Sequence, residues 1–263
     1  MTENSQRRYA FQPKISVCMA TYNGERHIEE QLRSILIQLR STDEVVIVDD
    51  ASTDLTRTII QEVNDTRVQM HVNTCNRGVL ASFETSLLKS SGDIIFFSDQ
   101  DDVWESGKLS TILQLFEMYP DVTVIASDAT VIDDFGKILN ESYYSTRSPF
   151  KTGLFANLFH FRFQGCGMAF RRSLFGEIFP FPHGFDLLHD EWIGLRARIS
   201  GHKIYYLNTP LFQYRRHLSN TSHTLPRGRQ IKVRLHLVTA LFTDAMRRRM
   251  NRSIRRVDRD AQA

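Results

Sequence analysis

The sequence predicts an α/β fold with a mostly parallel central sheet and helices on both of its faces. Strand-like and helix-like segments alternate four times within about the first 100 residues, as in repeated βαβ units. The strand-like runs are apolar along most of their length, which is typical of strands covered on both faces. With 263 residues, 41% of them hydrophobic and 24% charged, the chain is large enough to bury such a core.

The first four strands and three helices are expected in strict alternation. Runs of β-branched residues indicate the strands, and apolar residues three or four positions apart indicate the helices. The expected ranges are 15–20, 45–48, 68–72 and 94–97 for the strands, and 25–39, 51–63 and 78–88 for the helices with their caps. Because parallel strands end at the same edge of a sheet, Asp50 and Asp99 should lie at one edge.

The second half of the chain has a less regular pattern. Asp102 and Glu105 have the spacing of a capping box before a helix that reaches Phe116. Further on, a helix begins near His189 after a segment broken by two prolines. The other expected elements are a strand at 122–126, a hairpin at 130–139 that turns at 134–136, and strands at 203–206 and 211–214.

Residues 99–102 concentrate negative charge at the end of the fourth strand. Asp99, Asp101 and Asp102 repel one another, so a cation, a helix N-terminus or water has to neutralise them. Helix capping accounts for Asp102 alone. The Asp-x-Asp spacing of Asp99 and Asp101 lets both carboxylates reach one Mg²⁺ or Mn²⁺ ion, which commonly takes substrate phosphates as further ligands. The motif therefore predicts a metal-diphosphate site, with capping and solvation as the alternative.

Two other enzyme classes share part of this pattern. A dinucleotide-binding enzyme needs three glycines in its first strand-to-helix turn, and this turn offers only Gly24. An aspartate-nucleophile phosphatase of the haloacid dehalogenase type also carries Asp-x-Asp-x-Val at a strand end, as residues 99–103 do. That group usually begins its chain with this strand, whereas three strands precede it here. The phosphatase remains an alternative.

Asp190 and His217 each allow two interpretations. Asp190 lies in the first turn of a predicted helix, where an acid complements the helix dipole, and this structural role competes with a catalytic one. A single histidine is more often a surface or packed residue than a ligand. Two arginines precede His217, however, and this setting favours a phosphate or metal contact as the second interpretation.

Positive charge is concentrated at the end of the chain. Residues 227–263 contain eleven Lys and Arg against three Asp, although the whole chain has a net charge of only +3. Apolar residues in this tail recur every three or four positions and predict an amphipathic helix: Ile231, Leu235, Val238, Phe242 and Ala245. We expect the tail to bind an anionic membrane surface. Packing on the domain or in a homodimer is the alternative, and the acidic body argues against nucleic acid.

The remaining features indicate a cytoplasmic protein. The three cysteines are far apart in the sequence and form no C-x-x-C pair, which indicates reduced thiols. Residues 1–14 form a polar leader without the apolar core of a signal peptide. No stretch approaches the roughly 18 to 20 apolar residues of a membrane span.

Seven short motifs in a fixed order make the chain resemble the family 2 glycosyltransferases of the GT-A fold. Each motif is weak alone, but their order is specific, and the match covers about residues 15–220. The form Asp-Gln-Asp-Asp-Val-Trp is similar to the rhamnosyltransferase-like branch of bacterial surface-polysaccharide biosynthesis, which includes O-antigen assembly. The motifs are 21–25, 48–54, 76–78, 98–104, 165–169, 189–192 and 214–217.

The resemblance implies a metal-dependent inverting glycosyltransferase. A sugar would move from a nucleotide-sugar donor, dTDP-rhamnose or a UDP-sugar, to a hydroxyl of a glycan or lipid-linked glycan. Asp190 would be the catalytic base, and Asp99, Asp101 and His217 would hold Mn²⁺ or Mg²⁺. The implied nucleotide-sugar contacts are Thr21, Tyr22, Asp49, Asp50, Asn76 and Asp99, and the implied acceptor side consists of Gly165, Cys166, Glu191 and Trp192. An inactive scaffold subunit of the same fold is the non-enzymatic alternative.

The resemblance also implies a domain organisation. A GT-A domain is expected at 15–222, with a nucleotide-binding half at 15–128 and an acceptor half at 129–222, followed by the basic helical tail at 223–263. The protein would be peripheral at the inner face of the bacterial cell membrane. One feature departs from the family, because residues 81–84 lack an arginine that many relatives place there to assist the diphosphate. Arg77, Lys108 or Arg215 could take its place.

Overall fold

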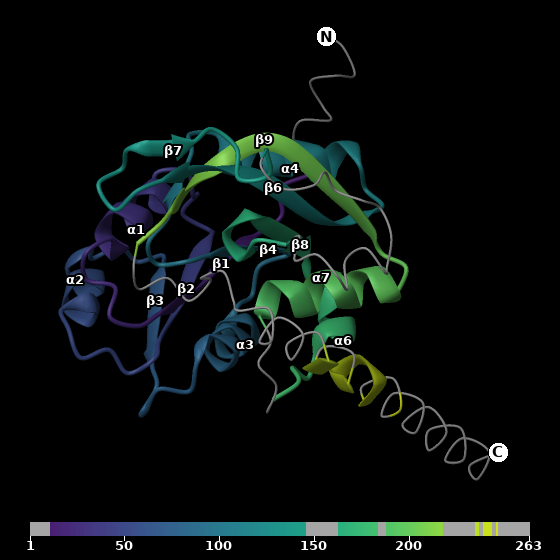
Figure 1. Cartoon of the computed structure of the whole chain (residues 1–263), viewed down its shortest axis with the longest axis horizontal. Helices are drawn as coiled ribbons and strands as arrows, with labels where there is room; N and C mark the ends of the chain where they lie inside the picture. Colours follow the sequence, from purple (N-terminus) through teal and green to yellow (C-terminus); the bar gives the residue numbers. More distant parts are fainter. Residues whose placement is uncertain are drawn as a thin grey trace.

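The structure is a computed structural model that describes residues 11–145, 163–183, 188–217, 235–236, 239–243 and 246. Within these residues, one mixed sheet carries helices on both faces (Figure 1). Its strands are β1 (Ile15–Thr21), β2 (Glu44–Asp49), β3 (Val68–Val72), β4 (Ile94–Ser98), β5 (Val103–Trp104), β6 (Val122–Ile132), β7 (Ile138–Asn140), β8 (Met168–Arg171) and β9 (Lys203–Arg215). The helices are α1 (Ile28–Leu36), α2 (Thr56–Glu62), α3 (Val79–Lys89), α4 (Lys108–Met118), α6 (Phe175–Ile178) and α7 (His189–Ile199), with 3₁₀ turns η2 (Gly165–Gly167) and η3 (Arg172–Leu174).

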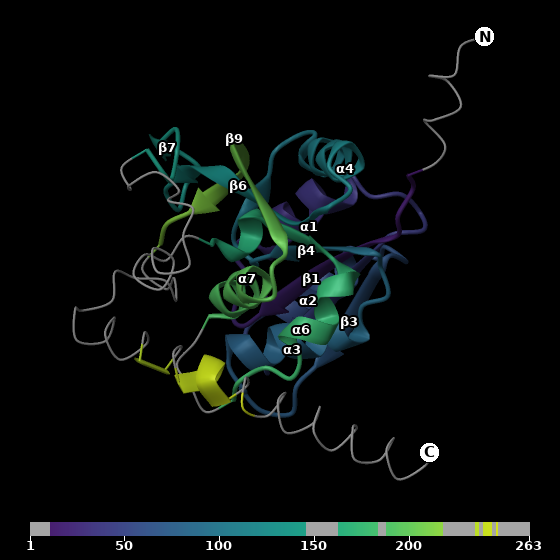
Figure 2. The same cartoon turned by 90° about the vertical axis from the view of Figure 1, so that its right-hand side faces the viewer.

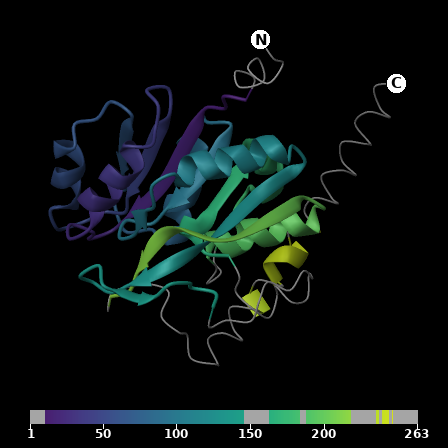
Figure 3. The same cartoon turned by 90° about the horizontal axis from the view of Figure 1, so that it is seen from above.

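The sheet has a parallel half and a mixed half. Strands β3, β2, β1 and β4 are neighbours in that order, and all of their pairings are parallel. In the other half β8 pairs antiparallel with β4 and β6, and β5 pairs antiparallel with β9. The long strands β6 and β9 run parallel, side by side, as the view from above shows (Figure 3). The predicted fold class and the alternation of the first 100 residues are confirmed.

Three details of the second half differ from the prediction. The expected capping box at Asp102 is wrong, because residues 103–104 pair with β9 and α4 begins only after Gly107, which has a positive φ of 82°. The two strands expected at 203–206 and 211–214 form the single strand β9. Strand β8 was not predicted, although the hairpin of β6 and β7 was.

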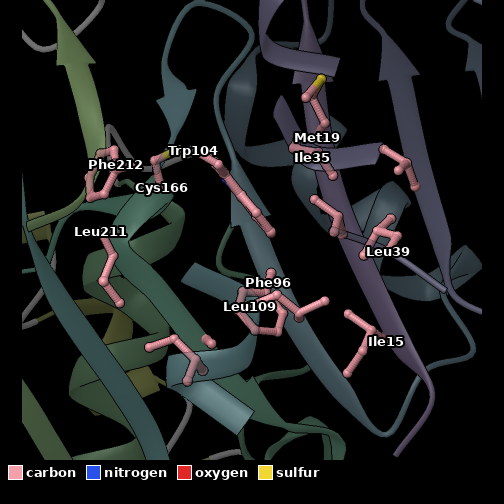
Figure 4. Packing of buried hydrophobic residues seen from close by; sticks show 14 of the residues in the cluster. Ile15, Met19, Ile35, Leu39, Phe96, Trp104, Leu109, Cys166, Leu211 and Phe212 are labelled. Carbon is pink, nitrogen blue, oxygen red and sulfur yellow. The ribbon is translucent and has the colours of Figure 1, made fainter. Parts of the chain in front are cut away.

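Two apolar cores lie on opposite faces of the sheet. The first contains buried residues of α1, α2 and α4, and the second contains buried residues of α3, α6 and α7. Strand β1 serves both cores, because Val17 and Met19 belong to the first and Cys18 to the second, as alternation along a strand requires. Figure 4 shows Met19 and Ile35 in the first core, and Figures 1 and 2 show α4 and α7 on opposite sides of the mixed half.

The carboxyl ends of β1, β2 and β4 meet at one edge of the sheet. Thr21 at the end of β1 pairs with Asp49 at the end of β2, and Met19 pairs with Ser98 at the end of β4. Asp50 and Asp99, which directly follow these strands, therefore lie at the same edge, as predicted.

Candidate active site

The carboxylate of Asp49 is buried among hydrogen-bond donors of the protein itself. It accepts from the backbone N–H of Ser52 at 3.0 Å, from the Ser52 hydroxyl, and from the Thr21 hydroxyl at 3.2 Å. Thr21 is itself buried. These bonds fix the turn after β2 against the end of β1, so both polar side chains are used inside the protein.

Asp50 organises the segment between β3 and α3 in the same way. One carboxylate oxygen accepts from Asn73 Nδ2 at 2.7 Å and from the backbone N–H of Arg77 at 2.8 Å. The other accepts from the backbone N–H of Gly78 at 2.8 Å. The carboxylate thus holds the turn that carries Asn76.

Tyr22 and Asn76 are the exposed members of the predicted nucleotide set. Tyr22 is 46% exposed and Asn76 is also exposed, whereas Thr21, Asp49 and Asp50 are buried. Direct contact with a ligand is therefore open to Tyr22 and Asn76, while the buried residues hold the loops that present them. Asp99, the sixth member, is half-buried, and contact of any of the six with a nucleotide stays a prediction.

The loop 99–102 is held in place by Arg215 of β9 and by His217. His217 Nε2 lies 2.6 Å from a carboxylate oxygen of Asp101. Arg215 donates its backbone N–H to Asp102 at 3.0 Å and its Nε to the Asp101 carbonyl at 2.9 Å. The predicted pair of Asp101 and His217 is thus brought together from positions 116 residues apart in the sequence.

The carboxylates of the acidic loop 99–102 are destabilised in their charged form by burial and by one another. Burial, together with the charges of Asp102, Asp101 and Asp190, raises the pKa of Asp99 well above its ordinary value. The pKa of Asp102 is raised to about 7, by burial first and by Asp101 second. The hydrogen bond with Asp101 raises the pKa of His217. Protons and nearby cations therefore stabilise this loop, and so would a divalent cation.

The donor set fits a hard divalent cation that also binds substrate oxygens. Asp101 and His217 are adjacent, and Asp99 precedes Asp101 in the loop 99–102. Among the described residues, no three His, Cys, Asp or Glu side chains are gathered closely enough to hold a metal ion alone. Mg²⁺ and Mn²⁺ sites in phosphate-transferring proteins characteristically complete their coordination with substrate phosphates and water. The exact ligand set stays a prediction.

Two of the three basic candidates for the diphosphate point into the protein. Lys108 is buried, donates from Nζ to the Cys166 carbonyl at 2.5 Å, and lies 4.4 Å from the Trp104 ring centroid. The Arg215 guanidinium contacts the Asp101 carbonyl and, at 2.7 Å, the Glu30 carboxylate. Arg77 is exposed, so it is the candidate whose side chain has access to a ligand.

Asp190 occupies the first turn of α7 and faces the turn η2. It is 6% exposed, and its carboxylate accepts from the backbone N–H of Glu191 at 2.8 Å. Burial raises its pKa from 3.8 to about 7. A Cβ on Gly165 would lie 2.7 Å from His189 Nε2, so glycine permits this close approach of η2 to α7. The charge of Asp190 also contributes to the raised pKa of Asp99.

The predicted acceptor side requires a correction. Trp192 is fully buried in the second core, and its indole N–H donates to the Ile178 carbonyl at 2.8 Å. Cys166 is fully buried in the first core, beside Trp104 and Phe212 (Figure 4). The side chains of Trp192 and Cys166 therefore pack in the two apolar cores and are not exposed to an acceptor. Glu191 is also buried.

Two glutamines at this edge were missed by the sequence reasoning. Gln31 of α1 donates to Ser98 Oγ at 2.6 Å and to the Asp99 carbonyl at 3.0 Å. Its signal in the sequence is a polar residue inside the apolar stripe of a predicted helix. Gln100 bonds to the backbone of Tyr22, and its position inside the Asp-x-Asp motif carries no signal for that contact.

Comparison with known proteins decides the family. The profile described as "Glycosyl transferase family 2" matches residues 16–179, which is more than half of the chain. The chain belongs to this family. Its membership confirms the resemblance found in the sequence and argues against the aspartate-nucleophile phosphatase.

Several glycosyltransferases are similar to this chain in sequence. An uncharacterized glycosyltransferase of Nostoc sp. is 30% identical over 175 residues, which are 64% of this chain and 53% of that protein. The putative glycosyltransferase EpsH of Bacillus subtilis is 28% identical over 216 residues, 79% of this chain and 62% of that protein. The glucosyltransferase WfgD of Escherichia coli is 35% identical over 95 residues, 36% of this chain and 38% of that protein. The chain spans about half the length of the curated relatives it matches.

Solved structures share the fold. TarS of S. aureus, residues 1–349 in complex with UDP-GlcNAc, superimposes with a TM-score of 0.69 at 20% identity, covering 86% of this chain and 66% of that one. The mannosyltransferase PcManGT of Pyrobaculum calidifontis, in complex with GDP-Man and Mn²⁺, gives a TM-score of 0.62 at 23% identity, covering 90% and 65%. At these identities the likeness establishes the GT-A fold alone.

Proposed function

We propose that this chain is an inverting glycosyltransferase that moves a sugar from a nucleotide-sugar donor to a hydroxyl group of an acceptor. One observation carries the proposal. The buried Asp190 lies against Gly165 of η2, where a Cβ would be 3.9 Å from the Asp190 Cβ, and the next residue, Cys166, contacts Gln31, which also donates to the Asp99 carbonyl. We propose that this carboxyl and the acidic loop supply the base and the cation ligands that displacement of a diphosphate by a hydroxyl requires.

Asp190 has the properties of the catalytic base in this proposal. Its carboxylate takes the proton of the acceptor hydroxyl while that oxygen bonds to the anomeric carbon. The carbon–oxygen bond to the diphosphate breaks on the opposite side, and the diphosphate leaves with the electron pair, so the anomeric configuration inverts. A pKa near 7 makes the carboxyl a stronger base than an ordinary aspartate and leaves much of it deprotonated at neutral pH.

We assign the divalent cation, Mn²⁺ or Mg²⁺, to Asp101 and His217 with Asp99 beside them. The bound cation supplies neutralisation of the charge that develops on the leaving diphosphate. Arg215 and Gln31 hold the loop in position through its backbone carbonyls, and Arg77 is available on the diphosphate side.

The comparisons support a nucleotide sugar as donor. TarS is described in complex with UDP-GlcNAc, and PcManGT in complex with GDP-Man and Mn²⁺. WfgD is named for a UDP-Glc donor and a diphosphoundecaprenol-linked GlcNAc acceptor. For this chain we propose a UDP-sugar or dTDP-rhamnose as donor and a glycan or lipid-linked glycan of bacterial surface-polysaccharide assembly as acceptor.

Thermal unfolding with UDP, dTDP and GDP, each with and without Mn²⁺, tests the proposal. A ligand that binds the folded state raises the unfolding midpoint, so at least one diphosphate should raise it more with Mn²⁺ than alone. Asp101→Asn should lose this extra shift and all measurable sugar transfer, while Asp121→Asn, an exposed ion-paired carboxylate, should behave as the wild type. Full transfer in EDTA, or no shift with any of the diphosphates, would contradict the proposal.

We also propose that the tail binds the inner face of an anionic bacterial membrane. Residues 235–236, 239–243 and 246 are helical. Ala240, 1% exposed, packs into the second core, while Leu235, Phe242 and Met246 are exposed. In an α-helix, spacings of seven and eleven residues put side chains on the same face. Within the part of the chain that the structure describes, no helix is long and apolar enough to cross a bilayer.

Sedimentation with vesicles that contain phosphatidylglycerol tests the membrane proposal. The double variant Leu235→Ser/Phe242→Ser should lose binding, and high salt should release the wild type, because the basic residues act through screened charges. Leu88→Ser, which changes an exposed leucine of α3, is the matched control. Equal sedimentation of all three proteins would refute the membrane role, and a change from dimer to monomer in the double variant would favour a homodimer.

A further inference from the structure

We propose that Gln100, the residue between Asp99 and Asp101, is a positioning residue that joins the metal-binding loop to the nucleotide-binding loop. The inference rests on the proposed function, because it concerns the donor site. It assigns a role to a side chain that neither capping nor metal binding explains. Through this residue, the loop that presents Tyr22 and the loop that carries the acidic motif form one unit.

The Gln100 side chain pairs with the Tyr22 backbone in both directions. The Tyr22 N–H donates to Gln100 Oε1 at 2.8 Å, and Gln100 Nε2 donates to the Tyr22 carbonyl at 3.2 Å. A carboxamide has one acceptor and one donor group side by side and so matches the two backbone groups of one residue. Glutamate at this position could accept but not donate.

Gly24 provides the space for this pairing. A Cβ built on Gly24 would lie 2.4 Å from Gln100 Oε1 and 2.6 Å from its Cδ, closer than real contacts allow. The φ of Gly24 is not among the positive values of this chain, so the backbone itself does not require glycine there. The space above Gly24 is needed for the Gln100 carboxamide.

The other parts of both loops are already fixed from different directions. Gln31 holds the Asp99 carbonyl and Arg215 holds the Asp101 carbonyl. On the other loop, the backbone N–H groups of Asn23 and Gly24 donate to the hydroxyls of Ser52 and Thr56. Among the described contacts, Gln100 supplies the side-chain link between the two loops. Gln100 therefore sets how the backbone of Tyr22 lies against the loop that carries Asp99 and Asp101.

Two substitutions break this link from opposite sides, which makes the test specific. Gln100→Met keeps the length of the side chain and removes both hydrogen bonds. Gly24→Ala leaves Gln100 intact but fills the space of its carboxamide. Each should raise the Kd of the best-binding diphosphate among UDP, dTDP and GDP about tenfold in the presence of Mn²⁺, because the ligand would then have to order the two loops that Gln100 holds together. Calorimetry well below the unfolding midpoint of every variant measures these values.

The double variant Gly24→Ala/Gln100→Ser distinguishes positioning from general stability. Its reference is a third single variant, Gln100→Ser. If the two residues act through one contact, adding Gly24→Ala to Gln100→Ser should weaken binding no further. A role limited to stability would lower the unfolding midpoint and leave the Kd of the folded protein unchanged. Single variants with Kd within twofold of the wild type, or losses that simply multiply in the double variant, would overturn the inference. Failure of the wild type to bind any of the three diphosphates would overturn the proposed function, and the inference with it.

Discussion

The acidic residues near this edge of the sheet form two groups that differ in their hydrogen-bond donors and in their pKa values. Asp49 ends β2 and Asp50 follows it, and both receive hydrogen bonds from hydroxyl, amide or backbone donors nearby. The loop after β4 and the first turn of α7 carry Asp99, Asp102 and Asp190, whose pKa values are all raised, with burial as the first cause. Both groups are carboxylates in the same protein and near the same edge.

The difference separates structural carboxylates from reactive ones. A buried carboxylate that accepts several hydrogen bonds is stable in its charged form and serves to fix the backbone around it. A buried carboxylate with too few donors, or with like charges nearby, is stabilised by a proton or a cation. The first group therefore shapes the loops, and the second group has the properties needed for proton transfer and cation binding. Four expected outcomes test this division.

The largest effect is expected for Asp190→Asn. The amide cannot accept the proton of an acceptor hydroxyl, so sugar transfer should fall on the order of 10² to 10⁴-fold while nucleotide binding stays intact. Folding should become more stable at pH 8, because the amide is neutral and avoids burying a charge. At this chain length about 1 kcal/mol corresponds to a rise of roughly 2–4 °C in the unfolding midpoint. Near-normal turnover would return Asp190 to the structural group.

The next effect concerns pH. Asp190 has to be deprotonated to act as a base, and its pKa of about 7 lies above the ordinary 3.8, so activity should be lost as the pH falls below 7. The kcat/KM of the wild type, measured with saturating Mn²⁺, should fall about tenfold for each pH unit below this point. The residual activity of Asp190→Asn should lack this slope. A wild-type profile that stays flat down to pH 5 would show that another group is the base.

The third effect is a loss of stability in the variant Asp50→Ala, in the turn after β2. Asp50→Ala removes the acceptor of three hydrogen bonds, from Asn73, Arg77 and Gly78, and should lower the free energy of unfolding by about 1–3 kcal/mol, since water can replace part of them. Nucleotide affinity should fall as well, because the turn with Asn76 loosens. Urea unfolding and calorimetry measure the two effects.

A matched control keeps these two effects apart. Asp65 pairs with Arg67 at 2.7 Å and lies before β3, at the end of the sheet opposite the site. Asp65→Ala should therefore lower stability without changing nucleotide affinity. Equal nucleotide affinity in wild type and Asp50→Ala would mean that Asp50 has no part in shaping the donor site.

The sequence predicted what depends on local pattern and failed where the partner is distant. The parallel half and the shared edge of Asp50 and Asp99 follow from strand and helix periodicity, which is local. The role of Asp102 does not, because its donor is the backbone N–H of Arg215, 113 residues away. The contact of Gln100 with Tyr22 spans 78 residues and leaves no periodic signal. The motif 189–192 placed Trp192 on the acceptor side, whereas its side chain lies in the second core.

The smallest effect is expected for Thr21→Val, and it tests how far the structural group extends. Thr21 resembles a nucleotide contact by its motif, but it is 2% exposed and its hydroxyl donates to Asp49. Asp49 keeps both of its bonds from Ser52, so the loss of one hydrogen bond should cost about 1 kcal/mol or less. Nucleotide affinity should change less than about twofold, because the lost hydrogen bond joins Thr21 to Asp49 and involves no ligand atom. Tyr22→Ala, at the exposed neighbour, is the comparison, and calorimetry should find a clear loss of affinity there. A tenfold loss in Thr21→Val would instead mean that its hydroxyl turns to the ligand, and that the buried acids after β2 belong to the binding surface itself.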